Sequence, residues 1–333
     1  MIRSLQSPPF AEFIEITVLI SLIFAGSVNF VSSSGREDTK LRIALVENSF
    51  TGAAYRYQGF YDFYEKHHSE LDTGSNVTKD LNLLTTKIPK YSLQYQPSLL
   101  EDLSTHLKQL LPNADISIIS DVDVHEDIIF NNRTAISGND YDILILGHQE
   151  YVTQNEYDNL KQFVANGGTL IITTGNVFYA EVKYDKSNQS VTLVKGHDIR
   201  FDGNVAHKGI AERWENETKY WLGSNFYPIY YWENDYHHLY NNPFNFTGEG
   251  GGEEQYYDKS NPNIRIILDY NSSDPRYPIA TYELNYGKGK VIVIGLAAED
   301  ILSIRCHEMC QKFFNFIDEL ILDHVLPFYG QRR

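Results

Sequence analysis

The chain has 333 residues, of which 22% are charged and 42% are hydrophobic, so it can bury one large α/β domain or two smaller ones. This composition excludes a mainly disordered chain. The formal net charge of -16 leaves no excess of Lys and Arg to displace phosphate counterions, so no nucleic-acid partner is expected.

The first predicted feature is an apolar stretch from Ile16 to Val31. Asn29 interrupts it, and it is shorter than the roughly 20 apolar residues that span a bilayer. We expect a signal peptide, with an uncleaved membrane anchor or a buried strand or helix as the alternatives. The flanking charges argue against export, because only Arg3 precedes the stretch while several basic residues follow it.

Acceptor motifs for N-glycosylation argue for export. They begin at Asn76, Asn132, Asn188, Asn216, Asn245 and Asn271. We therefore expect residues 1–40 to be a signal peptide or anchor plus a linker, and the protein to be secreted or membrane-anchored on the extracytoplasmic side.

Strand and helix patterns alternate from Leu41 to Thr174, which predicts a doubly wound, mostly parallel sheet. Strands are expected at Leu41–Val46, Ile116–Ile119, Tyr141–Gly147 and Thr169–Thr174. Helices are expected through the aromatic run that ends near His67, at Leu99–Leu111 and at Thr153–Ala165.

The segment from Tyr141 to Asp185 is the most informative part of the chain. Its two strands are joined by one helix and should lie parallel, so the polar loops that follow them share the carboxyl edge of the sheet. Open α/β sheets bind their ligands at that edge. Asn166-Gly167-Gly168 predicts that the helix ends in a left-handed residue.

The pattern changes after Phe178. A hairpin is expected from Tyr179–Tyr184 and Val191–Lys195. A Tyr-rich insertion is expected at about 185–262, and its irregular aromatic region from Trp214 to Tyr257 is short of regular helix. The sheet should resume with Ile264–Leu268, Ile279–Leu284 and Val291–Gly295, and a helix from Ile304 to Leu322 should close the domain.

Cys306 and Cys310 are the only cysteines and share one face of the closing helix. Two thiols and His307 supply fewer ligands than a structural zinc site requires. A disulfide and two half-buried thiols are the remaining possibilities.

A strand of the GGTLIITT type that runs into a sharp turn resembles the class I glutamine amidotransferase-like fold. The exposed residue of that turn is a nucleophilic cysteine in the family, whereas this chain has Asn176 there. Because an amide cannot act as a thiolate, amidotransferase chemistry is not expected.

Two motifs carry a closer resemblance. Gly147-His148-Gln149-Glu150-Tyr151 and Gly175-Asn176-Val177-Phe178-Tyr179 resemble motifs of the C-terminal domain of the N,N-dimethylformamidase beta (large) subunit family. Weaker similarities cover Gly248–Asp258 and Gly289–Gly295. The chain departs from the family where Val152 and Ala180 replace a Trp after each Tyr, and where Thr174 replaces a Gly.

The resemblance implies an amide hydrolase with one iron ion held by Tyr151, Tyr179 and Glu253. Phenolate and carboxylate oxygens suit a ferric ion, which could polarise an amide carbonyl. The resemblance places His148 and Asn176 in support of the ligands. Glu150 should face elsewhere in an extended segment, so it is a candidate base or supporting group.

Other interpretations of these residues stay open. A chain with 24 tyrosines commonly buries some of them for packing alone. His148 fits a loop residue bonded to backbone, and Glu253 fits a solvated acidic loop. Glu299 and Asp300 lie after a late strand and are alternative acids at the same edge.

The sequence thus predicts an extracytoplasmic dimethylformamidase-like domain, a metal-dependent hydrolase of a small-molecule amide, on a glutamine amidotransferase-like α/β domain at 41–333. The alternative is a non-catalytic extracellular module that binds glycan or protein through the aromatic insertion, including His237-His238. In either case the N-terminal segment contacts membrane if it is not cleaved. The oligomeric state is not indicated.

Overall fold

The computed structural model describes residues 40–56, 58–69, 78–88, 97–130, 139–173, 177–202, 205–209, 213–228, 253–257, 261–268, 281–295 and 308–330. The chain divides into two units, Met1–Thr39 and Lys40–Arg333, and every described residue belongs to the second. The predicted signal peptide or anchor therefore lies outside the described residues, as do Asn176 and the side chains of Cys306 and Cys310. None of the helices in the described ranges is both long and apolar enough to cross a membrane.

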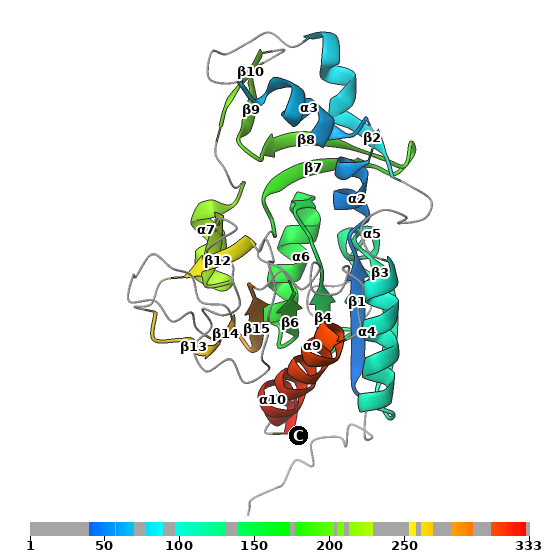
Figure 1. The fold of residues 1–333 in the computed structure, drawn as a ribbon, viewed down its shortest axis with the longest axis vertical. Helices are drawn as coiled ribbons and strands as arrows, with labels where there is room; N and C mark the ends of the chain where they lie inside the picture. Colours follow the sequence, from blue (N-terminus) through cyan, green and yellow to red (C-terminus); the bar gives the residue numbers. More distant parts are fainter. Residues whose placement is uncertain are drawn as a thin grey trace, which may run out of the picture. The chain divides into compact units, whose positions relative to one another are not determined.

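The larger sheet has the strand order β13-β14-β15-β6-β4-β1-β3 (Figure 1). Its strands are β1 (Arg42–Glu47), β3 (Asp115–Ser120), β4 (Ile143–Leu146), β6 (Thr169–Ile172), β13 (Ile264–Leu268), β14 (Thr281–Tyr286) and β15 (Gly289–Ile294). The strands from β3 to β15 pair in parallel, whereas β14 and β13 continue the sheet antiparallel. The fold is therefore mixed α/β, and the predicted parallel pairing of β4 with β6 is confirmed.

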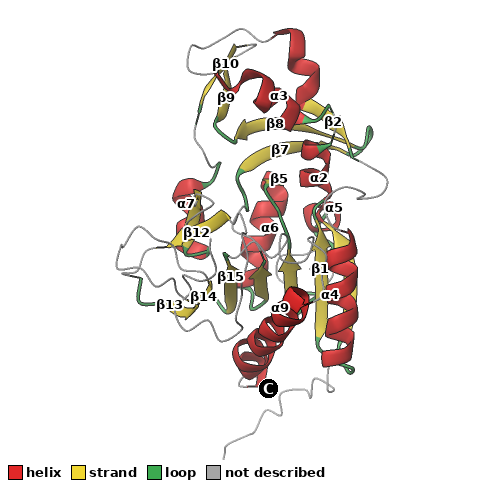
Figure 2. Ribbon diagram, viewed as in Figure 1, coloured by secondary structure: helices red, strands yellow, loops and turns green. Residues whose placement is uncertain are grey.

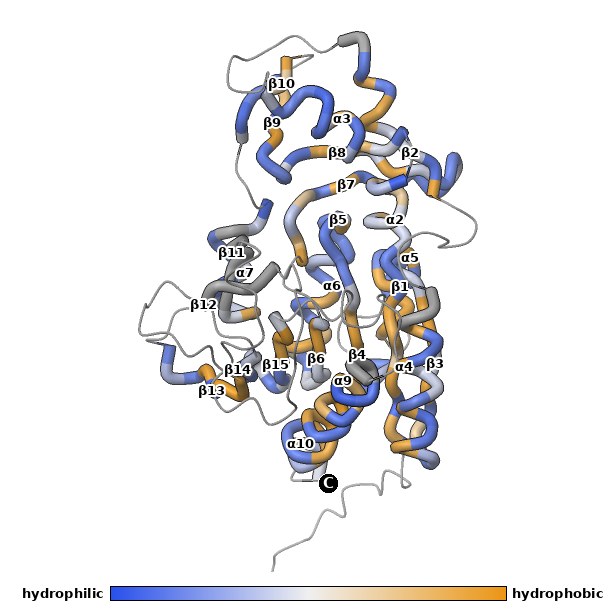
Figure 3. The backbone as a smooth tube through the Cα atoms, in the orientation of Figure 1, coloured by the Kyte–Doolittle hydropathy of each residue, from blue (hydrophilic) through white to orange (hydrophobic). Residues whose placement is uncertain are grey.

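Both faces of this sheet are buried. Ile43 and Leu45 of β1 join one apolar cluster, and Ala44 and Val46 join the other. Successive side chains of a strand point to opposite faces, so an unbroken apolar run covers both. The backbone of β1 and β4 is coloured mostly hydrophobic in Figure 3. On the first face lie α4 (Pro97–Leu110) and α9 (Glu308–Glu319), and on the second lies α6 (Gln154–Ala165).

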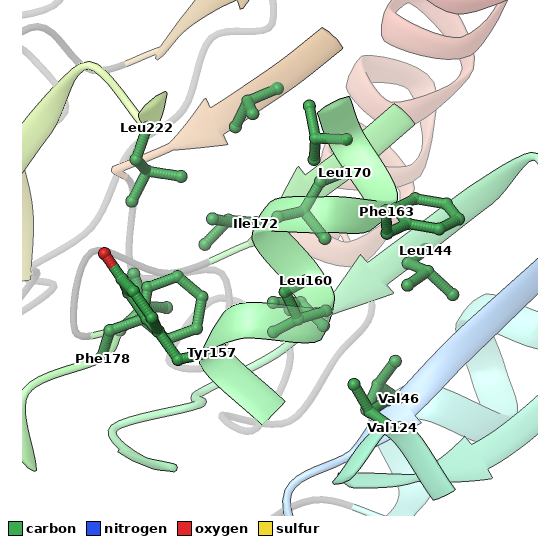
Figure 4. Close-up of a cluster of buried hydrophobic side chains, with 14 of the residues drawn as sticks. Val46, Val124, Leu144, Tyr157, Leu160, Phe163, Leu170, Ile172, Phe178 and Leu222 are labelled. Atoms are coloured by element: carbon green, nitrogen blue, oxygen red, sulfur yellow. The ribbon is translucent and has the colours of Figure 1, made fainter. Parts of the chain in front are cut away.

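Helix α6 sits on the sheet through Leu160 and Phe163, which pack with residues of β4 and β6 (Figure 4). Its first turn is capped by Thr153, whose hydroxyl accepts the backbone N–H of Glu156 at 3.1 Å. At the other end Gly167 has φ 115°, and the N–H groups of Gly167 and Gly168 bond back to the last turn. The predicted left-handed end of the helix is confirmed.

A second sheet has the order β10-β9-β8-β7-β5, with β2 paired to β8 (Figure 2). Its strands are β2 (Thr85–Lys87), β5 (Tyr151–Val152), β7 (Ala180–Asp185), β8 (Ser190–Gly196), β9 (Ile199–Asp202) and β10 (Val205–Lys208). The β7–β8 hairpin confirms the predicted one. Phe50 of α2 (Ser49–Tyr55) and Phe60 and Phe63 of α3 (Phe60–His67) share the apolar core of this sheet.

The predicted helix end near His67 is confirmed by α3, but Tyr55 belongs to the separate helix α2. The start of α3 requires glycine, because a Cβ on Gly59 would lie 2.1 Å from the carbonyl oxygen of Ala54. Only Gly allows the backbone of α3 to start so close to the end of α2.

One helix of the described chain, α7 (Glu215–Trp221), lies within the region expected to be short of regular helix. Packing accounts for this helix. Trp214 stacks on Tyr157 of α6 with ring centroids 4.4 Å apart, and the indole N–H of Trp221 donates to the Tyr157 hydroxyl at 2.9 Å. The remaining elements of the described chain are η2 (Thr78–Leu84), α5 (Asp121–His125), β11 (Ser224–Pro228), β12 (Glu253–Tyr257), the π-helix η5 (Leu320–Val325) and α10 (Leu326–Gly330).

Candidate functional site

The two polar loops predicted to share a sheet edge lead from the larger sheet into the second one. The chain leaves β4 and enters β5 at Tyr151, and it leaves β6 and enters β7 just after Tyr179. Tyr151 pairs with Ala180 in parallel register, and the Tyr179 N–H donates to the Glu150 carbonyl at 2.9 Å. The tyrosine-bearing segments thus lie side by side, as the sequence predicts.

Both tyrosines contact one histidine. The Tyr151 hydroxyl lies 2.9 Å from Nδ1 of His197, and the Tyr179 ring meets the same imidazole edge-on at 5.0 Å between centroids. Tyr151 is fully buried and Tyr179 nearly so. Burial, followed by the negative charge of Glu150, raises the pKa of Tyr151 well above its ordinary value, so its phenol is neutral unless a cation compensates a phenolate.

Glu150 belongs to the same group of side chains, which corrects the expectation that it faces elsewhere. Its carboxylate is fully buried and accepts the Tyr55 hydroxyl at 2.5 Å. Nε2 of His148 lies 3.1 Å from the same oxygen. The His148 side chain therefore contacts a buried carboxylate, which the interpretation as a loop residue bonded to backbone did not include. The second oxygen, Oε1, has no hydrogen-bond partner among the described residues and lies 3.7 Å from Nε2 of His197.

The protonation states follow from burial and from these contacts. Burial raises the pKa of Glu150. The hydrogen bond from His148 and the positive charges that His197 and His148 carry when protonated outweigh the effect of burial, so the pKa lies below its ordinary value. Burial lowers the pKa of His197 despite the opposing charge of Glu150. We therefore take Glu150 as ionised and His197 as neutral near pH 7.

Two further tyrosines complete the surroundings. Tyr61 and Tyr64 of α3 lie one turn apart on one helix face and contact His197 at ring-centroid distances of 5.6 and 4.3 Å. We use the name His197 cluster for Tyr55, Tyr61, Tyr64, His148, Glu150, Tyr151, Tyr179 and His197.

The sequence reasoning missed His197 and assigned no role to the three tyrosines of α2 and α3. The available signals were Gly196-His197-Asp198 between two strand patterns, which marks a tight hairpin turn, and the i, i+3 spacing of Tyr61 and Tyr64. Neither signal identifies which residues the turn and the helix approach.

Several predicted site residues are not brought into the cluster by any described contact. Asn176, Glu299, Asp300, His237 and His238 lie outside the described residues. Glu253 begins β12, which pairs antiparallel with β11, and its side chain is not described. Across the described ranges, no group of three or more His, Cys, Asp or Glu side chains is placed to hold a metal ion, a count that leaves out tyrosine oxygens.

Similar solved structures are distant from this chain. A putative ThuA-like protein from Bacteroides uniformis is 12% identical with a TM-score of 0.36, over 86% of this chain and 92% of that one. A cytoplasmic protein from Salmonella typhimurium LT2 is 12% identical with a TM-score of 0.35, over 69% of this chain and 84% of that one. A catalytic mutant of a GH42 β-galactosidase from G. stearothermophilus is 14% identical with a TM-score of 0.35, over 85% of this chain. The chain spans 30% of the length of that β-galactosidase.

These likenesses carry no argument about function, and no curated protein matches the chain. The family comparison is specific. The family described as N,N-dimethylformamidase beta subunit-like, C-terminal, matches residues 25–259, which is more than half of the sequence. The chain therefore belongs to the N,N-dimethylformamidase beta subunit-like C-terminal domain family.

Proposed function

We propose that this protein is a metal-dependent hydrolase that cleaves a C-N bond of a small amide, with one iron ion bound at the His197 cluster. Family membership supports the amide chemistry. The observation that carries the proposal is the gathering of two phenols and one buried carboxylate around a single imidazole, from segments far apart in the sequence.

The donor set fits a hard cation. Phenolate and carboxylate oxygens suit Fe(III), and Glu150 offers a buried oxygen that no hydrogen bond satisfies. A cation would also compensate the buried negative charge of that carboxylate. Tyr151 and Tyr179 would hold the ion, with Glu253 or Glu150 as the carboxylate ligand.

The proposed roles of the remaining residues follow from their contacts. When bound, the ion would polarise an amide carbonyl and lower the pKa of a bound water. His148 donates to Glu150 and keeps it ionised, which leaves Glu150 able to accept a proton as a base if Glu253 is the ligand. Asn176 is proposed to support the site from the loop after β6.

We further infer a doubly wound fold of the class I glutamine amidotransferase-like type, with an insertion at about 185–262. Parallel strands with helices on both faces support it. Export or membrane anchoring is proposed from the N-terminal apolar stretch and the glycosylation motifs. Expression in secretory cells tests export: a mobility shift after glycosidase treatment is expected, and an unglycosylated cytoplasmic product would contradict it.

The decisive experiment measures iron and activity together. Protein purified without chelators should contain about one iron per chain, show a visible phenolate-to-iron charge-transfer band, and release amine from N-substituted formamides. Tyr179→Phe removes one phenol oxygen with little change in packing, so iron content and activity should both fall. Tyr220→Phe, at an exposed residue of α7, is the matched control.

A binding module is the second candidate. Tyr220 is 73% exposed, and the Lys219 ammonium lies over its ring, an arrangement compatible with a surface contact to glycan or protein. However, Trp214 and Trp221 from the same region are buried in the core. Colourless protein without iron or amidase activity, but with measurable glycan binding that Tyr220→Ala abolishes, would favour this candidate.

A further inference from the structure

His197 occupies an unusual backbone position. It forms the turn between β8 and β9 together with Asp198, and the two residues have φ values of 52° and 60°. Consecutive left-handed residues make the tight hairpin turn that usually holds Asn or Gly, because other side chains disfavour this conformation. A histidine at this position indicates that contacts of its side chain compensate for the unfavourable backbone conformation.

The imidazole is also nearly buried, which is unusual for the tip of a two-residue hairpin. Four tyrosine rings enclose it: Tyr61 and Tyr64 from α3, Tyr151 from β5 and Tyr179 from the segment before β7. The hairpin therefore directs His197 between the two motif tyrosines and the helix that covers them.

Both ring nitrogens face polar atoms of the motif around Glu150. Nδ1 contacts the Tyr151 hydroxyl at 2.9 Å, and Nε2 lies 3.7 Å from the unbonded Oε1 of Glu150. The 2.9 Å contact between Nδ1 and the Tyr151 oxygen holds that oxygen in one direction, whichever of the two atoms carries the shared proton.

We propose that His197 is a positioning residue that sets the direction of the Tyr151 oxygen for metal binding, an inference that rests on the proposed function. His197 acts through Tyr151 and is not itself a ligand. His148 and Tyr55 contact the Glu150 carboxylate, at 3.1 and 2.5 Å.

The test uses two substitutions that suit a left-handed residue. His197→Gly removes the side chain without backbone strain, and His197→Asn keeps a polar atom near the place of Nδ1 at a φ that Asn tolerates. Loss of a group that orients a ligand typically weakens metal binding roughly 10- to 100-fold. We expect that loss of Fe(III) affinity, with a shifted charge-transfer band, in His197→Gly, and recovery to within roughly 3-fold in His197→Asn.

His106→Asn is the matched control, because His106 pairs with Asp318 on the face covered by α4 and α9 and should not affect iron. If His197→Gly is recovered unfolded, His197→Gln replaces it, since its amide lies one bond farther out and should not rescue. Adding Tyr151→Phe to the His197 variant should weaken iron binding no further than Tyr151→Phe alone.

The outcomes separate the two claims. Wild-type protein that binds iron, with His197→Gly matching its affinity and band, would overturn the positioning role and leave the proposed function standing. Wild-type protein that takes up no Fe(III) would overturn both.

Discussion

Two carboxyl groups outside the His197 cluster, those of Asp121 and Glu156, are fully buried. Within the described part of the chain, both oxygens of Glu156 and Oδ1 of Asp121 lack a hydrogen-bond partner. Burial raises the pKa of each group, and the charge of Asp121 raises that of Glu156 further. An unpaired buried carboxylate is costly, so the folded protein keeps a proton on this pair at a pH where the unfolded chain has lost it.

This pair should make the protein less stable as pH rises. The folded-state pKa of Glu156 is raised, so folding takes up a proton, and stability is lost as pH increases from the ordinary carboxyl pKa through the raised one. Glu156→Gln removes this dependence. At pH 8 its free energy of unfolding, measured by urea denaturation, should exceed that of the wild type by about 1–3 kcal/mol, and the difference should be smaller at pH 5. Asp158→Asn, at an exposed position of α6, is the control. An equal effect of Glu156→Gln at every pH would refute the explanation.

At the scale of elements, the end of α6 depends on a close approach. A Cβ on Gly168 would lie 2.3 Å from the ring of Phe163, whose other contacts form the core beneath the helix. We expect Gly168→Ala to lower the free energy of unfolding by about 1–3 kcal/mol through displacement of that ring. Gly52→Ala in α2, where nothing lies within 4 Å, should be neutral or gain up to about 1 kcal/mol. Equal melting temperatures for the two variants would show that the ring moves freely.

The β14–β15 hairpin is joined to the C-terminal π-helix by a buried ionic group. Lys290 donates to the Glu283 carboxylate at 2.9 Å and to the His324 carbonyl at 2.8 Å, and His324 Nδ1 lies 3.1 Å from the same carboxylate. Burial raises the pKa of Glu283, but the hydrogen bonds from His324 and Lys290 outweigh it and lower the pKa to about 2. A lowered folded pKa means that this stability exists above the ordinary carboxyl pKa and is lost as pH falls toward 2.

Removing the lysine takes a buried cationic partner from the Glu283 carboxylate and leaves it with His324 and Arg265. Lys290→Met should destabilise the protein by about 3–5 kcal/mol at pH 7, as seen by chemical denaturation. Lys288→Met, in the exposed turn of the same hairpin, should have little effect. Adding Glu283→Gln to Lys290→Met should restore part of the loss. A double variant no more stable than Lys290→Met would contradict the ionic explanation.

At the scale of the whole molecule, the sequence predicted the larger sheet well. The strands β1, β4, β6 and β15 each contain an apolar run that buries both faces, and such runs indicate parallel strands without knowledge of their partners. The end of α6 at Gly167 is equally local, because a single residue with φ 115° decides it. The tyrosine segments were predicted side by side for the same reason, since each follows one of these strands.

The second sheet and most of the His197 cluster could not be predicted in this way. Strand β5 has only two residues, and its identity comes from pairing with β7 and not from its own pattern. His197 meets Tyr151 across 46 residues of chain, and Tyr55 meets Glu150 across 95. The local sequence pattern carries no information about such contacts. They depend on where α2, α3 and the β8–β9 hairpin lie relative to the segment that holds Glu150 and Tyr151.

Diffraction from crystals of the iron-loaded protein, recorded on both sides of the iron absorption edge, would show where the metal binds. We expect one anomalous peak in contact with the phenol oxygens of both Tyr151 and Tyr179, beside Glu150 and within the His197 cluster. A peak elsewhere in the protein, or no peak in crystals soaked with Fe(III), would contradict it.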